Sequence, residues 1–237
     1  MTRVAIIAAM EGELSPLVRG WRRESRGGVD LWRLVHGDGE WLAACAGIGV
    51  GAAGRAFAEA ERAGPLGLAV SVGWAGALSE EFAVGRAYRV SGVIDARTGE
   101  RFPAGPGACW LVTSPGVAGR EEKRRLGAAH GAGLVDMEAA GVARLAAARG
   151  VPFRCIKGVS DGPSERLPDF DAFVSAEGGF LWARFAGFAL LRPWLWPALA
   201  RMGGASRRAA GAVAESLIEL LDPRGSARPR PPAPQAP

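Results

Sequence analysis

The sequence predicts an α/β fold, in which apolar strands alternate with helices along one chain. Two runs are apolar almost throughout, Val4–Ala9 (VAIIAA) and Leu66–Gly73 (LGLAVSVG), as is typical of strands buried on both faces. Between them, Val50–Arg62 places alanines and Phe57 on one face at helical spacing. Because 49% of the 237 residues are hydrophobic, the chain can bury a sizeable core without disulfides.

The next elements continue this alternation. Asp30–Ile48 is expected to be a hairpin, because His36–Gly39 supplies turn residues between two tryptophans. Arg86–Ala96 and Cys109–Thr113 are further predicted strands. Arg120–His130 is a predicted short helix, whose charge run we interpret as a solvent-exposed face. Strands that alternate with helices in this way give a layered α/β fold.

The last third of the chain begins with a strand–helix–strand unit and then becomes helical. A strand is predicted to end at Asp136, a helix at Arg149 and the next strand at Ser160. After Pro168 the pattern is mainly helical, and it finishes in an amphipathic helix from about Ser206 to Leu221.

The two ends of the chain differ in character. The start, MTRVAIIAAMEGE, has a short apolar run that meets acidic residues at once, which indicates a first strand rather than a signal peptide. We therefore expect a cytoplasmic protein. Residues 1–221 are predicted to form one domain, and the Pro- and Arg-rich segment 222–237 to be a disordered tail.

The net charge of +5 and the pI near 9.8 raise the question of nucleic-acid binding. Lysine occurs only at positions 123 and 157, so arginine supplies nearly all of the positive charge. Apart from Lys123–Arg125 and the tail, the basic residues are scattered, whereas a nucleic-acid footprint would be clustered. A nucleic-acid partner is therefore not expected.

Three widely spaced cysteines, Cys45, Cys109 and Cys155, complete the composition. Cys45 and Cys155 lie in apolar, strand-like runs, so we interpret the cysteines as reduced and mostly buried. Their spacing does not fit a metal site. No metal is expected.

Phe180–Ala200 comes closest to a membrane segment. Arg184, Arg192, Pro193 and Pro197 interrupt it, which argues against a spanning helix. We expect helices packed on the core or at a subunit interface. A membrane-surface helix is the alternative, because Trp and Arg suit the interfacial region.

Acidic and small residues collect where predicted strands end. The first strand runs into Glu11 and Glu13, and the strand at 66–73 runs into a glycine loop, Gly73–Gly76. Two later strands run into Asp136–Glu138 and Ser160–Gly162. Ligands of open α/β sheets gather beyond the carboxyl ends of strands, so these groups predict one shared site. Each also has a simpler interpretation, as helix-start acids or as ordinary turn residues.

Together, five segments of the sequence resemble the nucleoside phosphorylase and nucleosidase superfamily, in the family's own order. They are AIIAAMEGEL, ACAGIGVGAA, SVGWAGAL, VDMEAAGVA and KGVSDG, within about Val4 to Asp171. The pattern is most similar to the branch of methylthioadenosine/S-adenosylhomocysteine nucleosidases. The resemblance implies a three-layer phosphorylase/hydrolase-like fold with a mixed central sheet flanked by helices. It also implies a homodimer or a higher homo-oligomer. The implied enzyme would act in purine nucleoside catabolism and in methionine salvage.

The resemblance also implies roles for individual residues. Glu138 would bind the ribose hydroxyls, with Met137 packed against the sugar. Asp161 would protonate the purine at N7, positioned by Ser160, and Glu13 would activate the attacking water. Such carboxylates suit N-glycosidic cleavage, which builds positive charge on the sugar and negative charge on the base. The chemistry needs neither a metal nor an organic cofactor.

Several features depart from the family pattern. Trp74 stands in the glycine loop Gly73-Trp74-Ala75-Gly76 where a serine is usual, so it would narrow the site or add an apolar wall. The segment between Ala96 and Asp136 is short, and no clear aromatic residue for stacking the base is found there. Val117 is the candidate for lining the base pocket.

A phosphorylase would need cations for phosphate, whereas Glu11 and Glu13 would repel it, so we favour water as the nucleophile. Arg55, Arg97 and Arg101 are candidates for reaching substrate or phosphate. CIKGVSDGPSERLPDF followed by RPWLWPAL is similar to hopanoid-associated phosphorylase-like proteins, which implies an alternative: phosphorolysis of an adenosyl-linked lipid. A nucleoside-binding protein without catalysis, its nucleophile site blocked by Trp74, is a third possibility.

Overall fold

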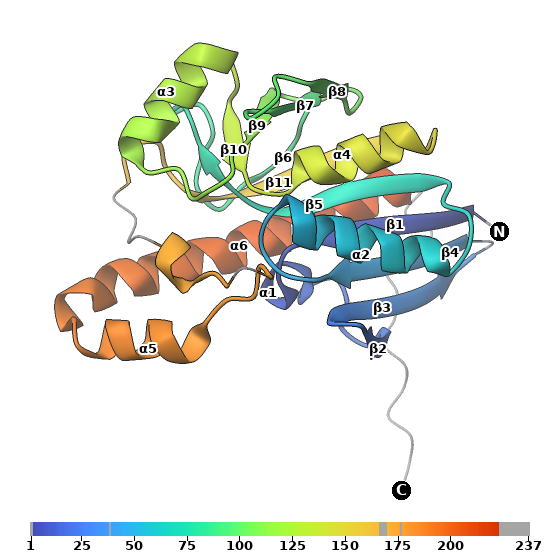
Figure 1. The fold of residues 1–237 in the computed structure, drawn as a ribbon, viewed down its shortest axis with the longest axis horizontal. Coiled ribbons are helices and arrows are strands. Elements are labelled where there is room, and N and C mark those ends of the chain that lie inside the picture. The colour runs from blue at the N-terminus through green and yellow to red at the C-terminus, as the bar shows by residue number, and fades with distance from the viewer. Residues whose placement is uncertain (1, 38, 166–169, 176, 223–237) are drawn as a thin grey trace, which may run out of the picture.

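A mixed β-sheet forms the middle of three layers (Figure 1). The computed structural model describes residues 2–37, 39–165, 170–175 and 177–222. The predicted tail at 222–237 lies, except for residue 222, outside the described residues.

The helices and strands alternate for most of the described chain. The strands are β1 (Thr2–Ala8), β2 (Arg22–Arg26), β3 (Val29–His36), β4 (Gly39–Cys45), β5 (Leu68–Ala77), β6 (Ala87–Arg89), β7 (Gly92–Asp95), β8 (Arg101–Pro103), β9 (Trp110–Thr113), β10 (Leu134–Asp136) and β11 (Phe153–Asp161). The α-helices are α1 (Glu11–Leu14), α2 (Val50–Arg62), α3 (Arg120–His130), α4 (Ala139–Ala148), α5 (Trp182–Leu190) and α6 (Trp196–Leu221), with 3-10 turns η1 (Asp171–Phe173) and η2 (Pro193–Leu195).

Strand β5 is the branch point of the sheet. It pairs in parallel with β1 and β11, and its last residues pair antiparallel with β10. The sheet order runs β2-β3-β4-β1-β5-β10-β9-β7-β8, with β11 bonded to β5 and β6. Strands β1, β5 and β11 therefore end at one edge, next to the end of β10, which is where a shared site was predicted.

The two faces of the sheet carry separate cores, and strand β1 shows why. Ala5 and Ile7 pack in the cluster that contains α2 and α4, whereas Ile6 and Ala8 pack in the cluster that contains α1 and α6. Successive side chains of a strand point to opposite faces, so an all-apolar strand is buried on both. The mixed, three-layer α/β architecture that the sequence predicted is confirmed.

Most predicted elements are confirmed, and four need correction. The strand predicted at Arg86–Ala96 is two short strands, β6 and β7, which pair with different neighbours. The glycine loop is not a loop, because β5 continues through Gly73–Gly76 to Ala77. The last helix is longer than predicted, starting at Trp196 rather than near Ser206. The charged run of α3 was predicted to be a solvent-exposed face. That prediction is wrong for Lys123, which is buried.

Residues 180–202 form a helical arm, which includes the predicted segment Phe180–Ala200 (Figure 1). Helix α5 has no buried residue, so it does not pack on the core, and its expected alternative place at a subunit interface stays a prediction. Aromatic rings of the arm instead contact one another and η1, as in the edge-on pairs of Phe173 with Phe185 and Phe188. Among the described residues, no helix is both long and apolar enough to cross a bilayer.

Candidate active site

A cavity of about 680 Å³ opens where the strand ends meet. A nucleoside-sized ligand fits a cavity of this volume. Nine of the ten residues predicted for the site line it: Glu13, Trp74, Ala75, Gly76, Val117, Met137, Glu138, Ser160 and Asp161. The tenth, Gly73, lies directly behind Glu13, since a Cβ atom built on it would be 2.5 Å from Glu13 Oε1.

The carboxylate of Glu13 is fixed by backbone amides. Its Oε2 accepts hydrogen bonds from the N–H groups of Ala9 (2.8 Å) and Met10 (2.9 Å), and its Oε1 accepts one from Trp74 (2.7 Å). Burial raises the pKa of Glu13, although the nearby Lys157 and these amides act in the opposite direction. A carboxyl group held in this way is pre-organised at the cavity wall, and a raised pKa suits a general base.

Trp74 serves Glu13 through its backbone, so the side chain is free for another contact. The indole N–H donates to the carbonyl of Ser206 on α6 (2.9 Å), and the ring lies against α1. A Cβ atom on Gly12 would come within 3.2 Å of that ring. The tryptophan therefore ties α1 to α6 and forms part of the cavity wall.

Glu138 stands at the start of α4 with both oxygens bonded. Its Oε1 accepts a hydrogen bond from the N–H of Gly49 (2.8 Å) and its Oε2 a longer one from Met137 (3.3 Å). Burial, and then the charge of Asp136, raises the pKa of Glu138 to about 8. The carboxyl group therefore accepts a proton readily while it remains at the cavity wall.

Beside Glu138, a buried ion pair that the sequence did not predict joins Asp136 to Lys157. Lys157 Nζ lies 2.8 Å from Asp136 Oδ2 and donates to the carbonyl of Val72 (3.2 Å). Burial alone would lower the pKa of Lys157, but Asp136 and the more distant Glu138 and Glu13 raise it. Lys157 is thus a fixed cation close to three of the site's carboxylates.

The interpretation of Asp136 as a helix-start acid is confirmed, but it is not the whole role. Its Oδ2 accepts the N–H of Ala139 in the first turn of α4 (2.9 Å), as an N-terminal acid should. Its Oδ1 accepts the hydroxyl hydrogen of Thr113 (2.7 Å). Three different partners therefore hold this carboxylate, including Lys157.

Asp161 and Ser160 lie on an irregular end of β11. The register with β5 shifts between Val159 and Asp161, and such a bulge re-aims side chains at the end of a strand. Ser160 Oγ donates to Asp161 Oδ1 (2.6 Å), and both residues line the cavity.

The other oxygen of Asp161 is paired with Lys123 of α3. Lys123 also donates to the carbonyl of Gly162 (2.6 Å), and only 1% of its side chain is exposed. Gly76 makes room for this pair, because a Cβ atom there would lie 2.9 Å from Lys123 Cε and 3.1 Å from Asp161 Oδ2. Lys123 is a second cation of the site that sequence reasoning missed.

The opposite end of the cavity is apolar and comes from the C-terminal third of the chain. Its lining residues are Phe170, Phe180, Trp182, Phe185, Leu199 and Met202. These rings supply the aromatic surface that the sequence analysis did not find. Near them, the N–H of Val117 donates to the carboxylate of Asp171 (3.0 Å), which joins the loop that follows β9 to η1.

The arginines suggested as ligand contacts lie elsewhere. Arg55 donates to the carbonyls of Ala46 (3.0 Å) and Glu177 (2.5 Å), Arg97 is exposed, and Arg101 stacks on the ring of Trp110. None of the three is among the residues that line the cavity. Their predicted contact with substrate is therefore not seen.

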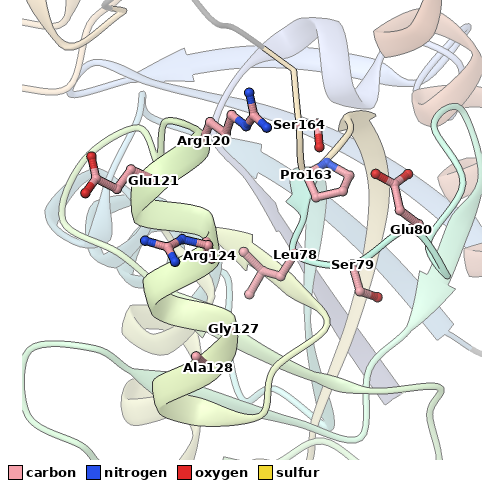
Figure 2. Close-up of a pocket in the computed structure, with 10 residues that line it drawn as sticks. All are labelled: Leu78, Ser79, Glu80, Arg120, Glu121, Arg124, Gly127, Ala128, Pro163 and Ser164. Carbon is pink, nitrogen blue, oxygen red and sulfur yellow. The ribbon is translucent and has the colours of Figure 1, made fainter.

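A second groove, of about 600 Å³, lies on another side of α3. Figure 2 shows it between α3, the segment that follows β5 and the segment that follows β11. Arg120, Arg124 and Glu80 give its rim mixed charge, and none of the carboxylates described above lines it. It carries no arrangement of catalytic side chains.

Cys45 and Cys155 are buried and Cys109 is half-buried, all three with free thiols. Burial raises the pKa of Cys45 and Cys155 to about 12 and that of Cys109 to about 11, so the thiols stay protonated. Within the described ranges, no three His, Cys, Asp or Glu side chains are grouped so that they could hold a metal ion.

Known proteins with this fold include several nucleosidases. The 5′-methylthioadenosine/S-adenosylhomocysteine nucleosidase of Helicobacter pylori superposes with a TM-score of 0.71 and 15% identity, over 94% of this chain and 98% of its own. Futalosine hydrolase of the same organism gives the same four values. The 5′-methylthioadenosine nucleosidase of Arabidopsis thaliana gives 0.71 and 18%, over 94% and 97%.

At the level of sequence, the model of the phosphorylase superfamily matches residues 105–178. No curated protein matches the chain significantly by sequence. The matched segment contains α3, β10, α4 and β11, and with them Lys123, Asp136, Glu138, Lys157 and Asp161. The fold that the resemblance implied is thereby confirmed, and the resemblance to the phosphorylase superfamily is confirmed for residues 105–178.

Proposed function

We propose that the protein hydrolyses the N-glycosidic bond of a purine nucleoside, with a 5′-substituted adenosine as its substrate class. One observation carries the proposal: Glu13, Glu138 and Asp161 come from separate strand ends and line one cavity of nucleoside size. The nucleosidases that share the fold are named for 5′-methylthioadenosine, S-adenosylhomocysteine and futalosine.

The three carboxyl groups divide the reaction between them. Glu138 and Met137 hold the ribose, and the base lies toward Asp161 and Ser160 at the end of β11, with Val117 on its other side. Glu13 removes a proton from the water that attacks C1′. The carboxyl oxygens around the sugar stabilise the positive charge that develops there, and protonation of the base assists its departure.

Water is favoured over phosphate by the charges around the cavity. Among the described residues that line the cavity, four are acidic and two are basic. They are Glu13, Asp136, Glu138 and Asp161, and Lys123 and Arg207. Lys123 is engaged by Asp161, and Arg207 is exposed at the rim. A phosphate dianion near Glu13 would meet like charge, which destabilises its binding.

The direct test is a panel of purine nucleosides, with methylthioadenosine, S-adenosylhomocysteine and inosine, incubated with the purified protein with and without phosphate. Chromatography should show release of the base and of a free ribosyl sugar in both conditions. Release only with phosphate, and of ribose-1-phosphate, would overturn hydrolysis. Binding without release from any nucleoside would favour the binding protein without catalysis.

A second candidate is favoured by the aromatic end of the cavity. Phe180, Trp182 and Phe185 form an apolar wall that suits a greasy 5′ substituent, as in an adenosyl-linked, hopanoid-type lipid. The sequence resemblance joins this lipid-linked substrate to phosphorolysis. The nucleoside panel with and without phosphate tests the phosphorolysis separately from the choice of substrate. An alkyl-thioadenosine series of increasing chain length should give a falling KM if the wall binds the substituent, and a constant KM if it does not.

The outer surface of the arm is the basis for proposing contact with a membrane surface. Exposed apolar side chains gather there: Leu181, Leu190, Leu191, Trp194 and Trp196. The sequence from Gly178 to Ala214 has five arginines and no acidic residue, which suits anionic lipid headgroups.

Sedimentation with vesicles that contain anionic lipid tests this contact. Leu191→Glu should reduce binding, whereas Val35→Glu, a change at a similarly exposed apolar residue of β3, should not. Equal binding by both variants would contradict the proposal. Association of the arm with a second copy of the chain, in line with the expected homo-oligomer, would instead appear as a change in mass by light scattering.

A further inference from the structure

We propose that Lys123 is the proton source for the departing base and that Asp161 passes the proton on. The inference rests on the proposed cleavage of a purine nucleoside and adds a residue to it. It starts from a difficulty in the simpler assignment. An Asp161 carboxylate that is already paired with an ammonium group has no proton of its own to give.

Three observations place Lys123 in the site rather than in the scaffold. It lines the same cavity as Asp161 and Glu13. Its ammonium group has three donors, of which Asp161 and the Gly162 carbonyl take two, and the third has no partner among the described residues. Every other charged residue of α3 is at least partly exposed, so this lysine alone turns inward from the helix.

The energetics of burial point the same way. A buried ion pair is a poor source of stability, because desolvation of both charges offsets most of their attraction. A well-packed apolar pair would serve the scaffold as well. Instead, Gly76 leaves the space that the Lys123–Asp161 pair fills. Burial also brings the neutral pair, an amine beside a carboxylic acid, closer in energy to the ion pair, which eases transfer of a proton between them.

The step balances as follows. The C1′–N9 bond breaks and its electron pair stays with the purine. Lys123 Nζ gives a proton to the Asp161 carboxylate at Oδ2, and Asp161 then gives that proton to N7 of the purine, so Asp161 ends as the carboxylate it was at the start and Lys123 becomes a neutral amine. Water adds to C1′ and gives its proton to Glu13. Glu13 releases that proton to solvent, and Lys123 takes one from solvent once the base has left.

The test compares two leaving groups on the full-length protein. Methylthioadenosine has a base that needs a proton, whereas its analogue with 4-nitrophenolate in place of adenine leaves without one. For Lys123→Met we expect kcat/KM on methylthioadenosine to fall by about 100-fold or more, the range of general acid catalysis, with a change of about threefold or less on the nitrophenyl analogue. Arg124→Met, one residue further along α3 and exposed, is the matched control and should change neither.

Lys123→Arg covers the case in which Lys123→Met does not fold. A guanidinium group keeps the ion pair but does not release its proton in proteins, so this variant should also lose activity on methylthioadenosine alone. Equal losses on both substrates, or full activity of Lys123→Arg on methylthioadenosine, would overturn the inference. If wild-type protein releases adenine from no nucleoside, the proposed function itself fails; wild-type cleavage with unchanged lysine variants refutes only the role of Lys123.

Discussion

The two ends of the cavity are built by opposite means. At the sheet edge, carboxylates and ammonium groups are almost wholly buried, and backbone N–H groups or ion pairs hold them in place. At the arm, aromatic side chains of helices that are mostly exposed form the wall. The first construction fixes atoms for chemistry, and the second offers adaptable apolar surface. Substitutions at the two ends should therefore have different kinds of effect.

The largest effect is expected at the sheet edge, for Glu13→Gln. The amide cannot take a proton from water, so kcat should fall by about 10²–10⁴-fold on every substrate, whatever its leaving group or 5′ substituent. Steady-state kinetics measures this, with Glu11→Gln as control, because Glu11 is exposed and paired with Arg23. If kcat falls only on substrates with long 5′ substituents, the chemistry is not confined to the sheet-edge end of the cavity, and the prediction is wrong.

The next effect is on stability rather than on rate. Lys157→Met removes the partner of Asp136 and leaves a buried carboxylate without its cation, which should lower the free energy of unfolding by about 3–5 kcal/mol at neutral pH. Urea denaturation gives the value. Arg125→Met, which breaks an exposed pair with Glu122, should cost only a small fraction of that. If the two variants lose similar free energies of unfolding, the buried Asp136–Lys157 pair does not stabilise the sheet-edge end of the cavity.

Glu138 should give the same end a measurable pH dependence. Its pKa is about 8 in the folded protein and near 4.5 otherwise, so the folded state keeps a proton that the unfolded chain releases between these values. The free energy of unfolding should thus fall as the pH rises from about 4.5 to 8, by at most about 1.4 kcal/mol per pH unit from this group. Glu138→Gln should remove that slope in urea titrations between pH 5 and 9; an identical slope in both proteins would contradict the assignment.

A smaller and more selective effect is expected at the arm. Phe185→Ala removes one ring from the apolar wall and should raise KM for a long-chain alkyl-thioadenosine about tenfold, with kcat for methylthioadenosine unchanged. Phe188→Ala, a ring of the same helix that does not line the cavity, is the control. A fall in kcat for both substrates would mean that the arm takes part in the chemistry.

The smallest effect sharpens the boundary of the site. Arg101→Ala removes a cation stacked on Trp110, outside the cavity, and should change stability by no more than about 1 kcal/mol and leave kcat and KM as they are. Thermal unfolding and the nucleoside assay check both statements. If Arg101→Ala lowers the activity, Arg101 contacts the substrate after all.

The sequence alone predicted the helices, strands and site residues that depend on local patterns and on the positions of strand ends. Val50–Arg62 was predicted as a helix with the bounds of α2, and Glu13, Glu138 and Asp161 were predicted to meet because strand ends of an α/β sheet share an edge. Lys123 was missed because its burial depends on Asp161, 38 residues away, while the charges around it on α3 are exposed.

The arm was misjudged for a related reason. Its apolar composition was recognised, but periodicity gives one apolar face per helix and does not say what that face contacts. Which rings line the cavity depends on how η1 and α5 fold over Val117 and the strand ends, and the bond from Val117 to Asp171 joins residues 54 positions apart. Tertiary contacts of this range are not encoded in a local pattern.

Both lysines of the chain, Lys123 and Lys157, have only 1% of their side chains exposed. The folded protein consequently presents almost no side-chain amine to a reagent in solution, although it carries 29 basic residues. Acylation at lysine becomes a reporter of opening: modification of Lys123 follows access to the cavity, and modification of Lys157 follows separation of the sheet from its buried carboxylates. Peptide mass spectrometry can read the two apart, and a bound nucleoside should shield the first before the second.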